Sequence, residues 1–339
     1  AFAASQIWSN APVNANWNTA ANWIGNAVPG AINQTGNTVN NDVATFNSPL
    51  VGGIGGAGNP ILTDDGTVLN LNLNRARTFG GITFDTPNVG AYVIQAGNPF
   101  INTSDTNFVG SGVFYVSHNG TIQMTAGVTN NQTILGPVRV RLPSSTAGIY
   151  NLVNNSTNLA TLFISAITND SANSRGTDFR LGGSNPGTNT IGVISAGTTT
   201  TGGNGLTKQG SGTWILAAAN DLRSQTVVRI LDGTLIAKDA GAFSLATSVT
   251  VTNPGILQID AVNLFQPFLN LHKGGTIRMN GTESLNGVAV GTHVATDVNL
   301  ATTSASDVFT VGTALLPTSV VSGGAADSVL NTAGPGTLV

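Results

Sequence analysis

The stretch that decides the fold reads Leu206-Thr207-Lys208-Gln209-Gly210-Ser211-Gly212-Thr213-Trp214-Ile215-Leu216, followed by Thr226-Val227-Val228-Arg229-Ile230-Leu231-Asp232-Gly233-Thr234-Leu235. In both halves a Gly-Thr pair opens a short apolar strand, and the second pair comes 21 residues after the first. Gly255-Ile256-Leu257 follows 22 residues later, and Gly275-Thr276-Ile277 another 20. This period is typical of one coil of a β-solenoid, which buries its apolar face only when the next coil stacks on it.

The repeat predicts where its residues lie. We expect Gly212, Gly233 and Gly275 at equivalent corners of successive coils, where glycine supplies a positive φ. The apolar residues after each corner form the wall of the coil. We expect one interior stack made of Leu235, Leu257 and Ile277, with Ile215 beside it.

Composition excludes a helical protein. Charged residues make up 8% of the 339 residues, whereas a typical soluble domain has about 25%. Glu283 is the single glutamate and lysine occurs three times, so the usual solvent-facing residues of helices are missing. The 43 glycines indicate many turns, and an apolar fraction of 40% is sufficient for a folded core. We therefore expect an all-β fold, a right-handed parallel β-solenoid with an aromatic N-terminal cap.

Composition also excludes several kinds of site. The chain has no cysteine, so it cannot form disulfides or thiolate metal sites. It has no apolar stretch of about 18 residues, so we expect no membrane insertion. A net charge of −3 gives no attraction to nucleic acid. Ala1-Phe2-Ala3-Ala4 has the pattern of a signal-peptidase site, which predicts a secreted chain whose signal peptide has been removed; the alternative is an alanine-rich start without meaning.

The motifs divide the chain into four segments. These are an N-terminal Trp-rich cap module at residues 1–48, irregular β-solenoid coils at 49–205, regular coils of about 21 residues at 206–282 and a C-terminal β segment at 283–339. Residues 182–205 are rich in Gly, Thr and Asn, and we expect a loop there.

Three of the four tryptophans, Trp8, Trp17 and Trp23, lie in the first segment. A stack of coils needs a covered end, so a cap is the favoured interpretation. The alternative is a sugar-binding platform, because exposed tryptophan faces stack on sugar rings. Exposure of these rings distinguishes the two interpretations.

The repeat resembles a known family. Leu206-Thr207-Lys208-x-Gly210-x-Gly212-Thr213, followed by Asp232-Gly233-Thr234-Leu235, resembles the autotransporter-associated β-strand repeat of bacterial passenger domains. Asn189-Thr190-Ile191-x-x-Ile194 and Asn22-Trp23-x-Gly25-x-x-Val28-Pro29 are similar to such proteins as well. The Asn-Thr-Tyr-x-Gly turn usual in that family is here Asn220-Asp221-Leu222-Arg223-Ser224. The resemblance implies a parallel β-helix outside a bacterial cell and no particular activity, because the fold hosts adhesins, proteases and structural stalks.

The common catalytic templates are not matched. His118, His272 and His293 have no second ligand at metal spacing. Gly53-Ile54-Gly55-Gly56-Ala57-Gly58 matches Gly-x-Gly-x-x-Gly, but a dinucleotide site must open a helix. This stretch runs into Asn59-Pro60 instead, so we expect a loop. We expect no catalytic residues, no cofactor and no metal.

The aspartates leave one enzymatic alternative open, a β-helical polysaccharide lyase or hydrolase. Asp64 and Asp65 are adjacent, and Asp239 and Asp260 are 21 residues apart. The second pair would lie on neighbouring coils, where two carboxylates bind Ca²⁺ or perturb each other's pKa. Solvated turn residues are the plainer interpretation. Arg139 and Arg141 share a strand face that we expect to be solvated.

These features favour an extracellular bacterial structural protein without enzymatic activity. A stack of coils ends in unpaired sheet edges, and residues 283–339 contain no Lys or Arg to protect such an edge. A head-to-tail contact that does not close into a ring propagates as a filament. We therefore expect homopolymeric fibres on or outside the cell surface, with an adhesin or glycan-binding module as the alternative. The expected assembly contacts are Ala1, Phe2, Ile7, Trp8, Val329, Leu330, Leu338 and Val339.

Overall fold

The structure, a computed structural model, describes most of the chain up to residue 260 and shorter stretches beyond it. The described residues are 4–32, 39–63, 77–95, 114–140, 148–169, 176–195, 205–222, 226–260, 264–265, 268–272, 274–280, 282–286, 289–292, 298–302, 305, 308–311, 320–322, 330–333, 335 and 337–338. They fall into two compact units. Unit 1 is Ala1–Arg175, Asn185–Asn189 and Gly197–Thr199, and unit 2 is Gly176–Ser184, Thr190–Ala196 and Thr200–Val339.

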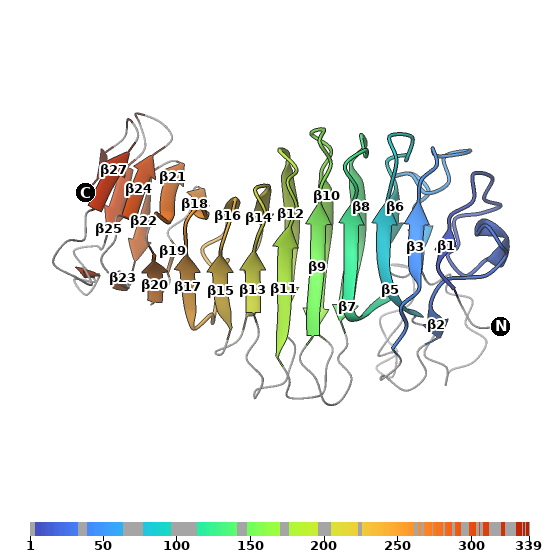
Figure 1. Cartoon of the computed structure of the whole chain (residues 1–339), viewed down its shortest axis with the longest axis horizontal. Coiled ribbons are helices and arrows are strands. Elements are labelled where there is room, and N and C mark those ends of the chain that lie inside the picture. The colour runs from blue at the N-terminus through green and yellow to red at the C-terminus, as the bar shows by residue number, and fades with distance from the viewer. Residues whose placement is uncertain are drawn as a thin grey trace. The chain divides into compact units, whose positions relative to one another are not determined.

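Unit 1 is a stack of irregular coils. Its strands are β1 Gln6–Ile7, β2 Ala31–Ile32, β3 Val43–Phe46, β4 Ile61–Leu62, β5 Arg77–Phe84, β6 Val93–Gln95, β7 Phe114–Met124, β8 Gln132–Val140, β9 Gly148–Asn154 and β10 Leu162–Asn169, with a 3₁₀ turn, η1, at Ala20–Asn22. The first ladder is β1–β3–β5–β7–β9 and the second is β4–β6–β8–β10, both parallel. A third parallel ladder runs β5–β7–β8–β10. It uses the first halves of β5 and β7 and the second halves of β8 and β10. Figure 1 shows the long arrows of this unit side by side.

Parallel register places like residues above one another in the core of unit 1. Four isoleucines, one from each strand of the second ladder, are Cα partners in sequence: Ile61, Ile94, Ile134 and Ile164. All four are fully buried. In a parallel sheet neighbouring strands lie about 4.8 Å apart, so each side chain covers the one below it. The apolar interior is therefore continuous through the coils, although the loops between them differ in length.

Unit 2 is built from shorter, more regular coils. Its strands are β11 Thr177–Gly182, β12 Thr188–Ser195 (most of which belongs to this unit), β13 Gly205–Lys208, β14 Thr213–Leu216, β15 Val227–Ile230, β16 Thr234–Ala237, β17 Ser248–Val251, β18 Ile256–Asp260, β19 Leu264–Phe265, β20 Phe268–Leu271, β21 Thr276–Asn280, β22 Thr282–Asn286, β23 Ala289–Thr292, β24 Val298–Thr302, β25 Val308–Val311, β26 Val320–Ser322, β27 Leu330–Ala333 and β28 Thr337–Leu338. Three parallel ladders run β11–β13–β15–β17–β20–β23–β26, β14–β16–β18–β21–β24–β27 and β19–β22–β25–β28. Figure 1 shows β13, β15 and β17 in succession.

The predicted interior stack of unit 2 is confirmed, with one correction. Leu235, Leu257 and Ile277 are Cα partners and fully buried. Their partner on β14 is Trp214, not Ile215. Successive side chains on a strand point to opposite faces, so Trp214 points inward and Ile215 outward. The Trp214 indole N–H donates to the carbonyl of Gly182 at 3.0 Å, which is why this large polar-tipped ring lies inside.

The corner glycines occupy equivalent positions in successive coils, as predicted, but the reason that glycine is required there differs from the predicted one. The register aligns Gly212, Gly233, Gly255 and Gly275, each one residue before a paired strand. Among these four only Gly233 has a positive φ, of 65°. At Gly255 an added Cβ would lie 2.5 Å from the carbonyl oxygen of Ile230. The corners therefore require glycine chiefly because neighbouring coils approach too closely for a side chain.

Lys208 was missed by sequence reasoning and is the most unusual core residue. It is fully buried and is the Cα partner of Ile230, within an otherwise apolar interior position. Its ammonium donates to the carbonyls of Gln209 at 3.2 Å, Gly210, and Asp232 at 2.9 Å. Burial lowers the pKa of Lys208 from 10.5 to about 8, and the nearby charge of Asp232 opposes this shift. At neutral pH the side chain is thus a cation whose three protons join two successive corners.

The predicted fold class, an all-β parallel β-solenoid with an aromatic N-terminal cap, is confirmed. The prediction of a loop at 182–205 is wrong in part, because β12 lies within it. Ile191 and Ile194 of this strand are fully buried. The many Gly, Thr and Asn residues around them obscured these apolar residues in the sequence.

Truncation of the interior stack gives a direct test of register. We expect Leu235→Ala to lower the free energy of unfolding by about 2–5 kcal/mol, because it leaves a cavity between two fully buried neighbours. The matched control is Leu231→Ala, since Leu231 lies in the same coil but is 40% exposed. It should change stability by less than about 0.5 kcal/mol. Equal losses in urea unfolding would contradict this assignment.

The buried lysine predicts an unusual pH dependence. Because the native pKa of Lys208 is about 8 and its ordinary value, expected in the unfolded chain, is 10.5, only the unfolded chain keeps this proton between the two values. The free energy of unfolding should therefore rise with pH above 8, by about 1 kcal/mol per pH unit. Below pH 8 both states carry the proton and this contribution is constant.

The matched control for this measurement is Lys208→Met, which keeps the length of the side chain and removes the titrating group. Urea unfolding between pH 8 and about 9.5 avoids tyrosine ionisation. That limit matters because burial raises the pKa of Tyr92 to about 12, which destabilises the native state as pH rises above about 10. An identical slope in both proteins would show that Lys208 is not responsible.

Candidate functional site

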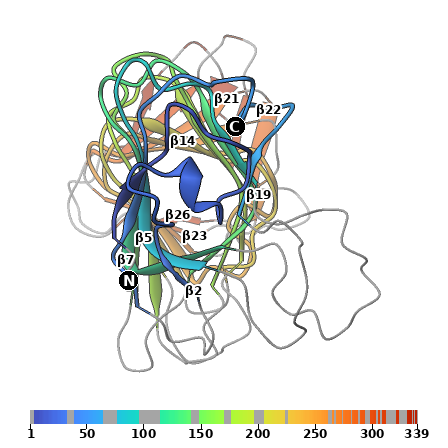
Figure 2. The same cartoon turned by 90° about the vertical axis from the view of Figure 1, so that its right-hand side faces the viewer.

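The three N-terminal tryptophans form the core of a cap. Trp8, Trp17 and Trp23 are at most 1% exposed. The ring of Trp23 meets that of Trp8 edge-on at 5.0 Å and that of Trp17 at 4.8 Å, and Trp17 stacks on Phe79 at 5.2 Å. Such edge-on and offset contacts are favourable beyond the area they bury. In the end-on view of Figure 2 the η1 turn lies over the space that the coils of unit 1 surround. The rings are thus inside the cap and offer no face to a sugar.

The cap covers the outer edge of the first ladder. β1 pairs with β3 through Gln6↔Ala44 and Ile7↔Thr45. The other edge of β1 is covered by the segment around η1, because the N–H of Ile24 donates to the carbonyl of Ile7 at 2.8 Å. An antiparallel bridge between Trp8 and Trp23 continues this contact. The ladder therefore ends in a local turn and not in an open strand.

The cap also covers the first strands of the other two ladders. At β4, the N–H of Leu62 donates to the carbonyl of Ala15 at 2.8 Å, and the N–H of Trp17 donates back to the carbonyl of Leu62 at 2.9 Å. At the start of β5, β2 pairs in antiparallel fashion, with Ala31 opposite Thr78. All three ladders of unit 1 are thus closed at their N-terminal end.

A polar latch holds β2 on β5. Arg77 donates from Nη1 to the carbonyl of Gly30 at 2.9 Å, and the N–H of Gly30 donates to Oδ2 of Asp42 at 3.0 Å. Arg77 also donates from Nε to Oδ1 of Asn18. Burial lowers the pKa of Arg77. Gly30 has a φ of 89°, and an added Cβ would lie 2.7 Å from the carbonyl of Thr78. Two charged side chains are thereby linked through the backbone of a single residue, Gly30.

A buried amide fixes the loop within the cap. Oδ1 of Asn22 accepts from the N–H of Val13 at 2.8 Å, and its Nδ2 donates to the carbonyl of Asn16 at 2.7 Å. Asn22 is fully buried. The buried amide therefore joins two separate points of the loop at residues 13–16 to the η1 turn. Sequence reasoning missed both Asn22 and the latch, since polar residues at this density look like ordinary loop composition.

The C-terminal ends of the ladders differ from the capped end. β26 pairs with β23, β27 with β24 and β28 with β25. Among the described residues, no strand pairs with the outer edge of β26, β27 or β28. In the part of the chain that the structure describes, the last strands of unit 2 therefore differ chemically from the capped first coil of unit 1.

Of the eight residues predicted as assembly contacts, four lie within the described part of the chain. Ala1, Phe2, Val329 and Val339 lie outside the described residues. Leu330 and Leu338 belong to β27 and β28. Ile7 is half-buried on β1, whereas Trp8 is fully buried within the cap. An assembly role for these residues stays a prediction, and the ring of Trp8 faces its own chain.

The candidate carboxylate pair is not formed. The register places Asp260 beside Lys238 and Asn280, not beside Asp239. Oδ2 of Asp260 lies 3.4 Å from Nζ of Lys238, and Oδ1 of Asp239 accepts from the N–H of Gly241 within a turn. Asp64 and Asp65 lie outside the described residues. Within the described ranges, no three His, Asp or Glu side chains gather as metal ligands would.

The described residues of the other motifs do not gather into a site. Residues 53–58 form a loop of turns with positive φ at Gly53 and Gly55, as predicted. His118 in unit 1 and His272 in unit 2 are half-buried, and His293 lies outside the described residues. Arg139 is half-buried on β8 and Arg141 is not described.

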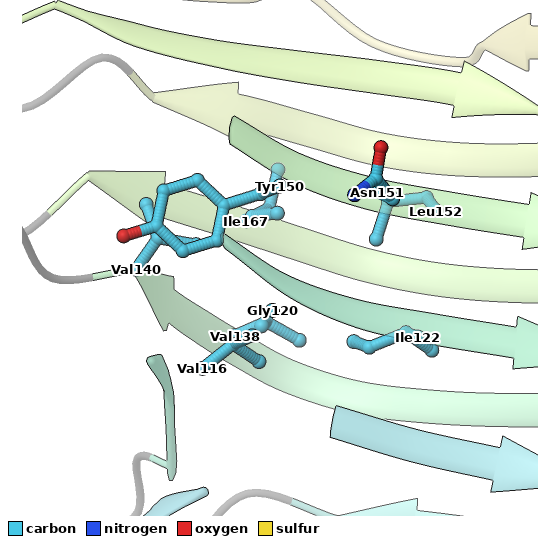
Figure 3. Close-up of a pocket in the computed structure, with 9 residues that line it drawn as sticks. All are labelled: Val116, Gly120, Ile122, Val138, Val140, Tyr150, Asn151, Leu152 and Ile167. Carbon is cyan, nitrogen blue, oxygen red and sulfur yellow. The ribbon is translucent and has the colours of Figure 1, made fainter. Parts of the chain in front are cut away.

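A gap between the coils of unit 1 is too small to bind a ligand. Figure 3 shows its lining: Val116, Gly120, Ile122, Val138, Val140, Tyr150, Asn151, Leu152 and Ile167. The gap has no room for a water-sized molecule. The side chains around it are mainly apolar, so it is a packing defect of the core.

Burial of the cap tryptophans can be tested by fluorescence. We expect blue-shifted emission with little quenching by acrylamide, because Trp214 is buried together with the three cap residues. Neutral oligosaccharides should leave the emission unchanged. Replacing Trp17 by Ala should cost about 3–5 kcal/mol in the stability of unit 1. A sugar-dependent shift of emission that is lost in Trp17→Ala would instead support a glycan platform.

Comparisons with protein-family models, with curated proteins and with solved structures give no match for this chain. The resemblance of residues 206–235 to the autotransporter-associated repeat accordingly stays a prediction. Within the described ranges, no helix has the length and apolarity needed to cross a membrane.

Proposed function

We propose that this chain is a structural protein of the bacterial cell surface that assembles head-to-tail into extracellular fibres. The observation that carries the proposal is the difference between its ends. The N-terminal ladders are closed by a cap, and the outer edges of β26, β27 and β28 have no partner strand among the described residues. Unlike ends make unlike surfaces, so a contact between them is heterologous and propagates unless it closes.

The charge distribution supports contact between copies. Soluble proteins commonly protect a sheet edge with lysine or other charges. Residues 1–48 contain one charged side chain, Asp42, and its carboxylate is bound within the latch. Residues 283–339 contain Glu283, three aspartates and no basic residue. Neither end carries the basic residues that discourage strand addition, and few charges would have to be desolvated in a contact.

The extracellular bacterial location rests on sequence alone. The absence of cysteine is ordinary for bacterial surface proteins, and the repeat resembles one found in passenger domains. The low charge and high Gly and Asn content suit a chain whose surface is made of turns and flat sheet.

The alternatives have less support. A glycan-binding platform would need exposed aromatic faces, and the three cap tryptophans are buried. A polysaccharide lyase or hydrolase would need clustered carboxylates, and Asp239 and Asp260 do not face each other. A structural role remains the function that the geometry supports best.

The proposal predicts concentration-dependent fibres. Sedimentation velocity and negative-stain microscopy of the full chain should show polymers of uniform width. A chain that lacks residues 326–339, and therefore β27 and β28, should not polymerise, while its far-ultraviolet circular dichroism remains that of a β protein. A full-length protein that sediments as a monomer at all concentrations would contradict the proposal.

A pair of proline substitutions separates edge pairing from misfolding. Consecutive N–H groups of a strand point to opposite edges, and proline removes one of them. Of Asn331→Pro and Thr332→Pro in β27, one removes a bond to β24 and lowers stability, whereas the other removes only an outward-facing donor. We expect the variant with nearly unchanged stability to lose polymerisation. If it polymerises normally, β27 does not accept a strand.

A further inference from the structure

Parallel ladders restrict how two copies can be joined. Every described pairing in the ladders of unit 2, and every one in unit 1 beyond the cap, is parallel. A new coil that extends the same ladders must therefore run in the same direction. A second copy can do so only by placing its C-terminal coil on the first coil of unit 1. The acceptor strands on that coil are β3, β4 and the beginning of β5.

The cap occupies these acceptor edges and ends the parallel pattern after one layer, because β1 still runs parallel to β3 and Asn16 forms a parallel bridge with Leu62 of β4. β1 covers β3, the segment at 15–17 covers β4, and β2 covers the beginning of β5. β2 runs antiparallel to β5, and the bridge that covers β1 is antiparallel as well. The segment at 15–17 is closed by its own cap, since the carbonyls of Asn16 and Trp17 accept from Nδ2 of Asn22 and Nε1 of Trp23. Within the described residues, the outer surface of the cap therefore presents no continuous parallel ladder on which another coil could stack.

We infer that the cap, residues 4–32, inhibits assembly, and that the edges of β3, β4 and β5 beneath it bind the C-terminal coil of a second copy. This inference rests on the proposed self-assembly and adds the step that controls it. The closed cap keeps copies apart, and displacement of the cap exposes three strand edges at once. Coil stacking then continues the ladders from one copy into the next.

The hidden surface suits a coil of the same kind. Phe46 and Phe79 are fully buried, and their rings contact Trp8 and Trp17 of the cap. Without the cap these two rings would lie exposed at the end of an apolar interior, which a stacking coil buries. The N–H and C=O groups freed at β3 and β4 would need strand partners. Both requirements are met by a second solenoid end and by no small ligand.

The cap is held by features that differ from those of the coils. β1 and β2 pair through two residues each, and the latch joins Arg77 and Asp42 to Gly30. The buried tryptophans add ring contacts to Phe46 and Phe79. The closed state is therefore favoured, and its opening should limit the rate of assembly and also weaken the apparent affinity between copies.

A disulfide lock tests whether the cap must open. Ala31 and Thr78 are directly paired across antiparallel strands, at a separation that a disulfide spans, and the chain has no other cysteine. We expect oxidised Ala31→Cys/Thr78→Cys protein to remain monomeric, and the same protein after reduction to form fibres as the unmodified chain does. Ala31→Ser/Thr78→Ser is the matched control without a crosslink. Equal assembly of the oxidised and reduced forms would overturn the inference, while the proposed fibre function would stand.

Removal of the cap gives the complementary test. A chain that begins at residue 33 should assemble without the lag of the full chain, measured by light scattering and by microscopy of the product. Assembly of this chain combined with a permanently monomeric full chain would support the inference and contradict the proposed function. If the shortened chain folds, as judged by circular dichroism, and stays monomeric, the inference is wrong. If it does not fold, the comparison of the oxidised and reduced disulfide variant decides whether the cap must open for assembly.

Discussion

The constraint on which the structure depends is that a parallel coil cannot satisfy its own backbone. Each strand has N–H and C=O groups along both edges, and in a solenoid these groups are paired only by the coils above and below. Register, corner geometry and the capped end all follow from this requirement. The isoleucines of unit 1 and the stack of Leu235, Leu257 and Ile277 are aligned because the hydrogen bonds align the strands. For the same reason, unpaired backbone N–H and C=O groups remain at the outermost strands of a ladder, where they can bind another strand.

The corners impose a second requirement, which neutral amides meet. Gln132 accepts from the N–H of Tyr92 at 3.1 Å and donates to the carbonyl of Gly90 at 2.8 Å. Asn154 accepts from the N–H of Ser156 and donates to the carbonyl of Ala160, both at 2.9 Å. These side chains are fully buried. An amide has donors and acceptors without a net charge, so it satisfies buried backbone groups without the large desolvation cost of an ion. The high content of asparagine and the low content of charged residues thus follow from the same requirement.

The sequence predicted the regular part of the fold better than its ends. Spacing of Gly-Thr pairs was sufficient for register in unit 2, because each coil there repeats the same corner. It did not distinguish Trp214 from Ile215, since both are apolar and only the acceptor at Gly182 favours the indole inside. It also missed the latch and Asn22, whose partners are distant backbone groups with no signature in the sequence. The cap was predicted from tryptophan density, but its antiparallel closure depends on tertiary contacts that no local pattern encodes.

The Lys208-x-Gly210-x-Gly212-Thr213 phrase has a physical explanation in the same contacts. Lys208 extends through an apolar layer and donates to carbonyls at Gly210 and at Asp232 of the next coil. Gly233 lies directly on this ammonium, since an added Cβ would be 2.6 Å from Nζ. The lysine and the following Asp-Gly-Thr therefore act as one unit, in which a cation joins two corners that glycine brings close together. The motif thus fixes the spacing of successive coils, which is a role in the fold that needs no ligand.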